Sequence, residues 1–162
     1  MIKLVAGSGH ERYGGSIDHK AVRIMKIITR DTDYAIRALA CVAGSGGGVV
    51  TVKEISEKLD IPRPFLRKIF QVLNQKGVLT SSKGRGGGFS LALDPSKISV
   101  FTLMEIFQGP FCLNEHLFKG GMCPMVKVCF LKRKLDRMEK DLIRELKRVS
   151  ISDMVRKDTK RG

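Results

Sequence analysis

The stretch that decides the fold is PFLRKIFQVLNQKGVLTSSKGRGGGFSLAL, residues 64–93. Apolar residues in its first half recur at helical spacing and predict a helix with a buried face, lined by Phe65, Leu66, Ile69, Phe70 and Leu73. Gly77 is the expected C-terminal stop of this helix. In the second half, VLTSS and FSLAL are short, β-compatible segments joined by the turn KGRGGG. The stretch therefore predicts a helix followed directly by a β-hairpin.

A shorter helix is expected just upstream. The sequence TVKE predicts a capping box, in which Thr51 caps the helix and Glu54 bonds back to the Thr51 amide. This helix should end near Asp60, and the PRP at residues 62–64 should open the next one, because proline is tolerated in a first helical turn. A short helix, a turn and a second helix form a helix-turn-helix, so the following hairpin is its wing.

Three further helices are expected, over residues 31–43, over residues 100–108 and from Leu131 onward. The last of them carries an apolar seam with coiled-coil-like spacing, formed by Leu131, Leu135, Met138, Leu142, Leu146 and Val149. A single copy would expose this seam, so we expect it to pack against a second subunit; packing back onto its own domain is the alternative. The expected fold class is mainly α with a small β-hairpin wing, a winged helix-turn-helix plus a long dimerisation helix.

Charge is the strongest signal in the composition. Thirty Lys and Arg residues face 16 Asp and Glu, which gives a formal net charge of +14. Such an excess favours polyanionic partners, either nucleic acid or an anionic membrane. No apolar run of about 18 residues predicts a membrane span. Four cysteines and no visible signal peptide indicate a cytoplasmic protein with reduced thiols.

The outer face of the helix that follows PRP is a candidate reader of DNA. It presents Arg63, Arg67 and Gln71 at spacings of four residues, with Lys68 beside them. Arg and Gln have the bidentate geometry that reads guanine and adenine edges in the major groove, whereas Lys68 more plausibly meets a phosphate. The alternative is an ordinary solvated helix face.

The tip of the expected wing is a second candidate contact. It offers Lys83 and Arg85 among four glycines, which would allow the backbone to approach a narrow minor groove. A glycine-rich loop could instead cradle a nucleotide phosphate. We reject that interpretation because GxxxxGK[ST] is absent and no strand–loop–helix surrounds KGRGGG.

Three cysteines, Cys112, Cys123 and Cys129, follow one another as C-x10-C-x5-C. Zinc sites usually pair their ligands as C-x2-4-C, and no such pair occurs here. The spacing suits an iron–sulfur cluster on a loop, and such clusters normally take four thiolates. Cys41 lies among apolar residues of a helix and is expected to be a buried structural thiol. The absence of a CxxC argues against a thiol redox enzyme, and we expect no enzymatic activity.

The fourth ligand of such a cluster must come from elsewhere. His116 lies in the same loop and is the nitrogen candidate, although it could equally be a solvent-exposed histidine. Glu115 and Asp33 are the oxygen candidates. A ligand other than a thiolate would leave one iron open to attack, which a sensor needs.

Three segments together resemble a known family: MKIITRDTDYAIRAL, FLRKIFQVLNQKGVLTSSKGRGGGFSLA and GGMCPMVKVCFLKRKL. They are similar to the IscR/NsrR-type regulators of the Rrf-two family, over about residues 25–155. The resemblance implies a homodimeric winged-helix transcription factor on a palindromic operator. Many members repress, and many hold a 2Fe–2S or 4Fe–4S cluster on the three loop cysteines to sense nitric oxide, iron or cluster status, or redox poise.

The resemblance also bears on single positions. Lys83 matches a basic wing residue that members place in the minor groove. Arg67 matches a base-reading position that can be acidic in members, which implies an operator with guanine rather than cytosine. Some members ligate the cluster with a histidine where this chain has Lys132, which cannot serve. Nitric-oxide-sensing members use an aspartate of the partner subunit where this chain has Asp33, so Asp33 in trans is the first candidate and His116 the second.

The sequence therefore predicts four segments: a disordered extension (1–24), a winged helix-turn-helix (25–99), a cluster-binding loop with the dimerisation helix (100–155) and a basic tail (156–162). Met25 as the true start is a hypothesis that would remove the extension. The expected function is a homodimeric transcriptional regulator that acts as a repressor. Its binding to a palindromic double-stranded operator is expected to depend on an iron–sulfur cluster. The alternative is a regulator without a cluster that senses by cysteine oxidation or zinc binding. The plain alternative for Asp33 is a helix cap.

Overall fold

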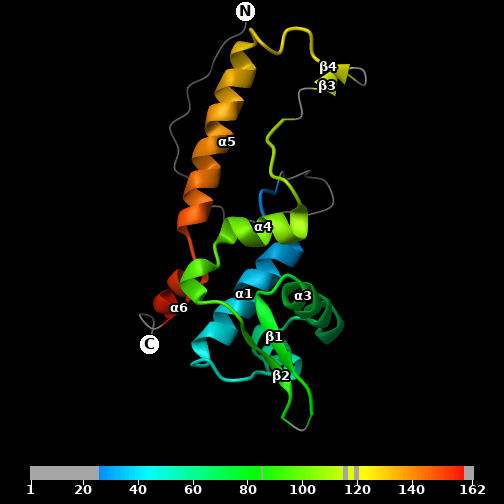
Figure 1. The fold of residues 1–162 in the computed structure, drawn as a ribbon, viewed down its shortest axis with the longest axis vertical. Coiled ribbons are helices and arrows are strands. Elements are labelled where there is room, and N and C mark those ends of the chain that lie inside the picture. Colours follow the sequence, from blue (N-terminus) through cyan, green and yellow to red (C-terminus); the bar gives the residue numbers. More distant parts are fainter. Residues whose placement is uncertain (1–25, 85, 115–116, 119–120, 159–162) are drawn as a thin grey trace, which may run out of the picture.

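The computed structural model describes residues 26–84, 86–114, 117–118 and 121–158. A compact head holds most of the elements, and one long helix projects from it (Figure 1). In chain order the elements are α1 (Arg30–Gly44), α2 (Val52–Leu59), α3 (Arg63–Gln75), β1 (Leu79–Ser82), β2 (Gly88–Leu91), the 3-10 helix η1 (Pro95–Lys97), α4 (Val100–Gln108), β3 (Leu117–Phe118), β4 (Gly121–Met122), α5 (Phe130–Arg148) and α6 (Ile151–Asp158). The expected class, mainly α with a β-hairpin wing, is confirmed. The 1–24 extension and residues 159–162 of the basic tail lie outside the described residues.

The helix-turn-helix begins with the expected capping box. The Thr51 N–H donates to Glu54 Oε2 at 2.8 Å, and the Glu54 N–H donates to Thr51 Oγ1 at 3.2 Å. Helix α2 ends at Asp60, whose φ of 52° reverses the chain. The Ser56 hydroxyl then donates to the Ile61 carbonyl at 2.7 Å, which fixes the turn into α3. Local hydrogen bonds thus set the angle at which α3 leaves α2.

Helix α3 ends in a Schellman motif around the expected glycine. Gly77 has a φ of 72°, its N–H donates to the Asn74 carbonyl at 3.0 Å, and the Val78 N–H donates to the Leu73 carbonyl at 2.9 Å. Val78 and Leu79 are buried immediately afterward. The cap therefore delivers the chain directly into β1.

One residue of the α3 stripe was wrongly placed in the core. Phe65 is 49% exposed, whereas the other four predicted core residues of α3 are at most 4% exposed. Successive residues advance by about 100° around a helix, so the four buried residues span only about 100° of its circumference. Phe65 lies about 40° beyond that arc, outside the reach of the neighbouring helices.

The wing is a short antiparallel hairpin that pairs Leu79 with Leu91 and Ser82 with Gly88. A third segment joins it, because Val50 and Phe89 exchange backbone hydrogen bonds of 2.9 and 2.8 Å. The Phe89 ring meets the Phe70 ring edge-on, with centroids 5.1 Å apart. The wing is therefore packed against α3 and not merely joined to it by the chain.

The last two helices of the head were only partly expected. Helix α4 matches the predicted 100–108, but α6 was not predicted; it continues past residue 155 into the expected basic tail. At the start of α6 the Asp153 carboxylate reaches back to Ser150, whose N–H donates to Asp153 Oδ2 at 2.9 Å. This S-x-x-D signature was available in the sequence and was missed.

Helices α4 and α6 pack against α1, and Leu103 and Ile151 are fully buried in the same core as Leu39. Backbone hydrogen bonds of 2.9 Å, from Val100 N–H to Val149 O and from Ile151 N–H to Ile98 O, tie the two helices together. Val149, expected in the helical seam, instead lies just past the end of α5. The division of the chain at residue 99 stays a prediction, since elements beyond it share this core.

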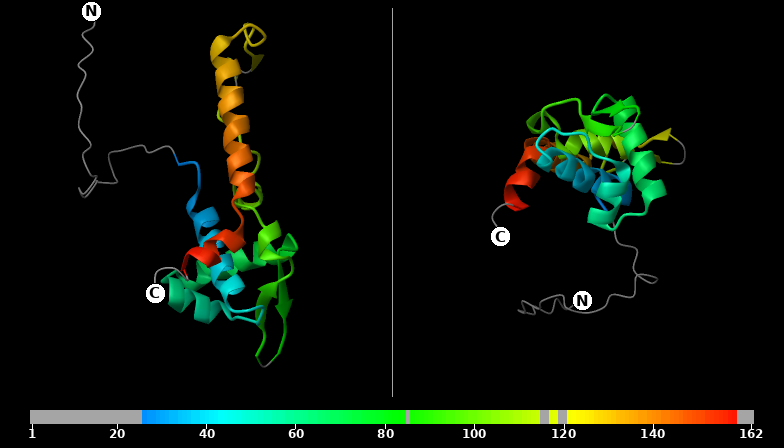
Figure 2. Two further views of the ribbon diagram at one scale, coloured as in Figure 1. Left: turned by 90° about the vertical axis from the view of Figure 1, so that its left-hand side faces the viewer. Right: turned by 90° about the horizontal axis from the view of Figure 1, so that it is seen from below.

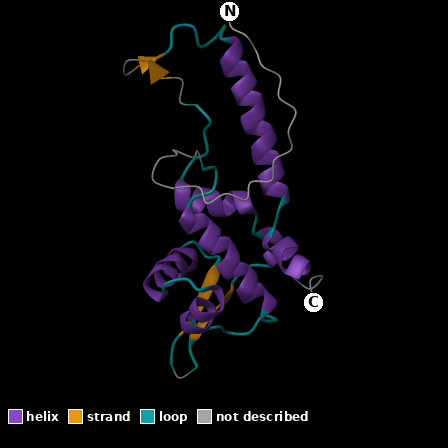
Figure 3. Ribbon diagram, turned by 180° about the vertical axis from the view of Figure 1, so that it is seen from behind, coloured by secondary structure: helices purple, strands orange, loops and turns teal. Residues whose placement is uncertain are grey.

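Helix α5 projects from the head as an arm (Figure 2). None of its residues is buried in the single chain, and Leu131 and Met138 are 61% and 60% exposed. Leu135, Leu142 and Leu146 are half-buried, so the expected seam is only partly covered by its own chain, and the second subunit stays a prediction. Seen from behind, the strands form only a minor part of the fold, in the wing and in β3–β4 (Figure 3). Within the described residues no helix is long and apolar enough to cross a membrane.

We predict that Gly88→Ala destabilises the head by at least about 2 kcal/mol, the cost of forcing extra volume into a packed site. A Cβ at Gly88 would lie 2.3 Å from the Val50 carbonyl oxygen, in a backbone pairing that cannot move aside. Urea unfolding measures the change. Gly44→Ala is the matched control, because nothing lies within 4 Å of its added Cβ. Equal stabilities of the two variants would contradict the account.

Candidate DNA-binding face and cysteine loop

The predicted DNA-contacting side chains of α3 all lie at the surface. Arg63, Arg67, Lys68 and Gln71 are exposed. None of the three cations is ion-paired with another described residue, so their charge is not neutralised within this part of the chain. Their side chains are therefore available to an external polyanion. Helix α3 has no acidic residue in its first turn, where a carboxylate would repel phosphate.

The wing extends the head at the end opposite to α5 (Figure 1). Lys83 at its tip is exposed, while Arg85 lies outside the described residues. Gly84 and Gly86 have φ values of 100° and 84°, and no atom lies within 4 Å of a Cβ added to either. These two glycines make the turn and leave the tip free. The structure thus separates the roles of the wing glycines.

Gly87 and Gly88 serve packing instead. A Cβ on Gly87 would lie 2.4 Å from the Ser82 carbonyl oxygen, and one on Gly88 would meet the Val50 backbone. All four wing glycines were predicted to allow a close approach of the backbone to DNA. Two of them are required by neighbouring backbone of the same chain, which no local pattern could indicate.

The cysteine loop joins the head to the arm. It leaves α4 through Gly109, whose φ is 79°, and reaches the start of α5 at Phe130. Cys112 is exposed, Cys123 and Cys129 are partly exposed, and all are free thiols. Cys129 is also the N-cap of α5, because its sulfur accepts the Lys132 N–H at 3.4 Å. Cys41 is only partly buried in α1.

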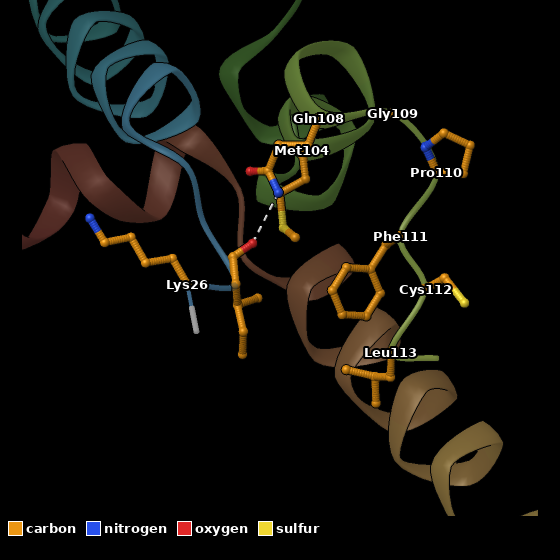
Figure 4. A pocket seen from close by; sticks show the side chains of 9 residues that line it. Lys26, Met104, Gln108, Gly109, Pro110, Phe111, Cys112 and Leu113 are labelled. Atoms are coloured by element: carbon orange, nitrogen blue, oxygen red, sulfur yellow. Dashed lines mark hydrogen bonds between the residues drawn. The ribbon is translucent and has the colours of Figure 1, made fainter. Parts of the chain in front are cut away.

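The three thiols have the soft donor chemistry that iron–sulfur clusters use. However, no group of three or more His, Cys, Asp or Glu side chains in the described part of the chain is placed to hold a metal. Cys129 lies at the outer end of α5, whereas Cys112 lies near α4 (Figures 1 and 4). Glu115 and His116 fall outside the described residues. The donors fit a cluster in kind, and the described residues do not bring them together.

Asp33 lies in the first part of α1, where its carboxylate accepts the Arg37 Nε–H at 2.9 Å. The interpretation of Asp33 as a helix cap is wrong, because Thr29 occupies the N-cap position of α1. Asp33 lines one pocket and Cys112 lines another, and Lys26 borders both. Any cluster role for Asp33 would first require its release from Arg37.

A polar joint between α4 and the start of α1 was not foreseen in the sequence. The Oε1 of Gln108 accepts the Thr29 N–H at 3.0 Å, the Thr29 hydroxyl at 3.3 Å and the Thr32 hydroxyl at 2.7 Å. Its Nε2 donates to the Ile27 carbonyl at 3.0 Å, as Figure 4 shows. We call this set the Gln108 joint. Its partners are 76 to 81 residues away in sequence, so no local pattern could reveal it.

The other end of the Cys112 segment is held by the arm. The Leu113 N–H donates to Glu139 Oε2 of α5 at 2.9 Å. Figure 4 shows the Cys112 sulfur on the opposite side of the chain from the Phe111 ring. Residues 109–113 are therefore strung between the head and the arm, with the thiol turned outward.

Known proteins are similar to this chain in sequence and in fold. The family described as Rrf2, iron-dependent transcriptional regulator, matches residues 28–157. A protein of Aquifex aeolicus (strain VF5) that carries the name of an HTH-type transcriptional regulator is 33% identical over 124 residues, or 75% of this chain and 86% of the relative. The HTH-type transcriptional regulator NsrR of Bacillus subtilis (strain 168) is 28% identical over 131 residues, or 80% and 90%.

Two solved structures share the fold. IscR of T. potens superposes with a TM-score of 0.65 at 23% identity, over 83% of this chain and 88% of that one. CymR, the global cysteine regulator of B. subtilis, superposes with a TM-score of 0.64 at 20% identity, over 81% and 97%. The family match covers the head, the wing and the arm together, so this chain belongs to the Rrf2 family and is a winged-helix transcriptional regulator.

Proposed function

We propose that the chain acts as a homodimer, binds a palindromic operator, and has its affinity set by an iron–sulfur cluster on Cys112, Cys123 and Cys129. The observation that carries this proposal is the placement of three free thiols on the one loop that connects the DNA-binding head to the projecting arm. The family's iron dependence supports it. We expect a repressor that works in the cytoplasm, where its thiols stay reduced.

The second subunit follows from the arm. Burial of apolar surface is worth roughly 25 cal/mol per Å², so the exposed seam residues Leu131 and Met138 of α5 favour pairing with an identical seam. Two-fold pairing of the arms would place two α3 helices on one side of a duplex. Half-sites about one helical turn apart would then match the two heads, which accounts for the palindrome.

DNA contacts divide into two kinds. Arg63, Arg67 and Gln71 of α3 are proposed to read base edges in the major groove, and Lys68 to meet the flanking backbone. Lys83 and Arg85 of the wing are proposed to enter or border the minor groove. Among the described residues, Arg63, Arg67, Lys68 and Lys83 form no ion pair that would neutralise their charge.

The three cysteines would hold the cluster, with Asp33 of the second subunit as fourth ligand and His116 as the alternative. When bound, the cluster supplies iron that reacts with nitric oxide or oxidants. The chain would position the ligands. Cys129 is already oriented by the α5 N-terminus, and Asp33 would give up its ion pair with Arg37 to serve as a ligand. Gathering the thiols requires the loop to change shape, which is what links signal to DNA affinity.

A second function rests on a different observation. Cys112 is exposed, and the three thiols are not gathered among the described residues. These facts favour a regulator of the same fold that senses through oxidation of its cysteines without a cluster; zinc binding is the other form of this alternative and would need the thiols to gather. The likeness in fold to CymR is compatible with this alternative.

Anaerobic purification decides between the two. We predict a brown protein that absorbs at about 400 nm and contains iron and acid-labile sulfide. Cys112→Ser, Cys123→Ser and Cys129→Ser should each lose the colour, because each removes a thiolate ligand. Cys41→Ser is the control that keeps it. A colourless wild-type protein free of iron would establish the alternative.

The fourth ligand has its own test. Asp33→Ala should shift the visible spectrum of the loaded protein and alter its reaction with nitric oxide, because a weak oxygen ligand is lost. Asp31→Ala removes an exposed carboxylate from the same helical turn and should change neither. An unchanged spectrum in Asp33→Ala would transfer the role to His116.

Removing Arg67 and removing Lys68 should have different effects on DNA binding. Arg67→Ala is expected to weaken operator binding by about 1–3 kcal/mol and to relax preference at one base position. Lys68→Ala should weaken binding to all sequences alike and lower the salt slope by about one. Fluorescence anisotropy over a range of salt concentrations measures both. Arg133→Ala, which removes an exposed cation of the arm, is the control and should leave the operator affinity unchanged.

A further inference from the structure

We propose that Gln108 is the positioning residue through which a change at the Cys112 segment reaches α1 and, through it, the DNA-reading helix. The inference rests on the proposed function, since it requires the thiol loop to sense something. It goes further by naming the contact that carries the signal into the head. Gln108 itself touches neither DNA nor any thiol in the described structure.

The first observation is how completely Gln108 is engaged. Its carboxamide oxygen accepts three hydrogen bonds and its nitrogen donates one, all to the segment from Ile27 to Thr32. Thr32, which makes the shortest of these at 2.7 Å, is fully buried. Because Thr32 is buried, water cannot easily replace its bond to Gln108 once that bond is broken, whereas the three bonds to Ile27 and Thr29 lie at the surface.

The second observation is what the joint connects. Thr32 is followed along the same helix by Ala35, Ala38 and Leu39, which are fully buried. Those residues share one core with Leu66 and Phe70 of α3. A displacement of the α1 N-terminus is therefore transmitted by close-packed side chains to the helix that carries Arg67.

The third observation is where Gln108 stands in the chain. It is the last residue of α4, and only Gly109 to Phe111 separate it from Cys112. The same segment is tied at its other end by the Glu139 carboxylate, through a single bond. A displacement of Cys112 can therefore be transmitted through two contacts, the Gln108 joint to the head and the Glu139 bond to the arm. The Gln108 joint has four hydrogen bonds and the Glu139 contact has one. We therefore assign the signal to the Gln108 joint.

The test compares operator affinities of the loaded and the iron-stripped full-length dimer, measured by anisotropy under anaerobic conditions. In the wild type the ratio of the two dissociation constants should fall within about 5- to 150-fold, the usual span of coupling between sites. Gln108→Leu keeps the size of the side chain and removes every bond of the joint. It should bring the ratio below about 3-fold while the visible spectrum stays that of the wild type.

Thr32→Val tests the joint from its other side. It removes the hydroxyl that donates to Gln108 and preserves the shape of the side chain. It should lower the ratio as well, and Gln108→Leu combined with Thr32→Val should lower it no further, because both act on one contact. An additive loss in the double variant would overturn the proposal.

Two control variants separate positioning from mere loss of stability. Ser99→Ala removes the N-cap of the same helix, where Ser99 Oγ accepts the Thr102 N–H at 3.1 Å, and leaves the joint intact. It should keep the wild-type ratio even if its unfolding midpoint falls as far as that of Gln108→Leu. Glu139→Ala removes the bond from the Leu113 N–H to the arm and should also keep the wild-type ratio.

A readout independent of the cluster is the exchange of the Thr29 amide, which donates to Gln108. In the iron-stripped protein this amide should exchange faster in Gln108→Leu than in Ser99→Ala. The proposal is overturned if Gln108→Leu keeps the wild-type ratio, or if Ser99→Ala or Glu139→Ala loses it equally. A wild-type ratio of one overturns the proposed cluster sensing itself and this inference with it, which distinguishes the two failures.

Discussion

Helix α1 and the burial of its apolar face hold the molecule together. Ala35, Ala38, Leu39 and Val42 are at most 1% exposed, and α3, α4 and α6 all pack against this helix. Two alanines at its centre let neighbouring helices approach closely. Shortening Leu39 to alanine would cost about 2–5 kcal/mol, a large share of a typical domain's stability. The DNA-reading helix and the thiol-bearing segment therefore have a common rigid support.

Polar contacts complete what this apolar core begins. The core can hold α1 and α4 together without specifying where their ends meet, because apolar contacts have little directionality. Hydrogen bonds at Gln108 define where the ends of α1 and α4 meet, and the backbone pair between residues 98–100 and 149–151 does the same for α4 and α6. The cysteine loop and the arm both leave the head next to such contacts.

The arm poses the opposite constraint. Helix α5 has a clean apolar seam, yet Leu131 and Met138 remain more than half exposed in the single chain. Its ion pairs, such as Arg144 with Asp141 at 3.0 Å, lie at the surface and contribute little to stability. The arm is thus a helix that gains little stability from the rest of its own chain, and the cysteine loop leads into it.

Local chemistry determined much of this protein from sequence alone. The capping box at Thr51, the stop at Gly77, the apolar period of α3 and α5 and the spacing of three thiols all involve residues within a few turns of one another. Contacts between distant segments were decided only by the tertiary structure. Phe65 is exposed because no neighbouring helix reaches it, Gly88 is required because Val50 crosses it, and Gln108 meets α1 across 76 residues. Sequence periodicity reports which face of an element is apolar; it carries no information about which partner covers that face.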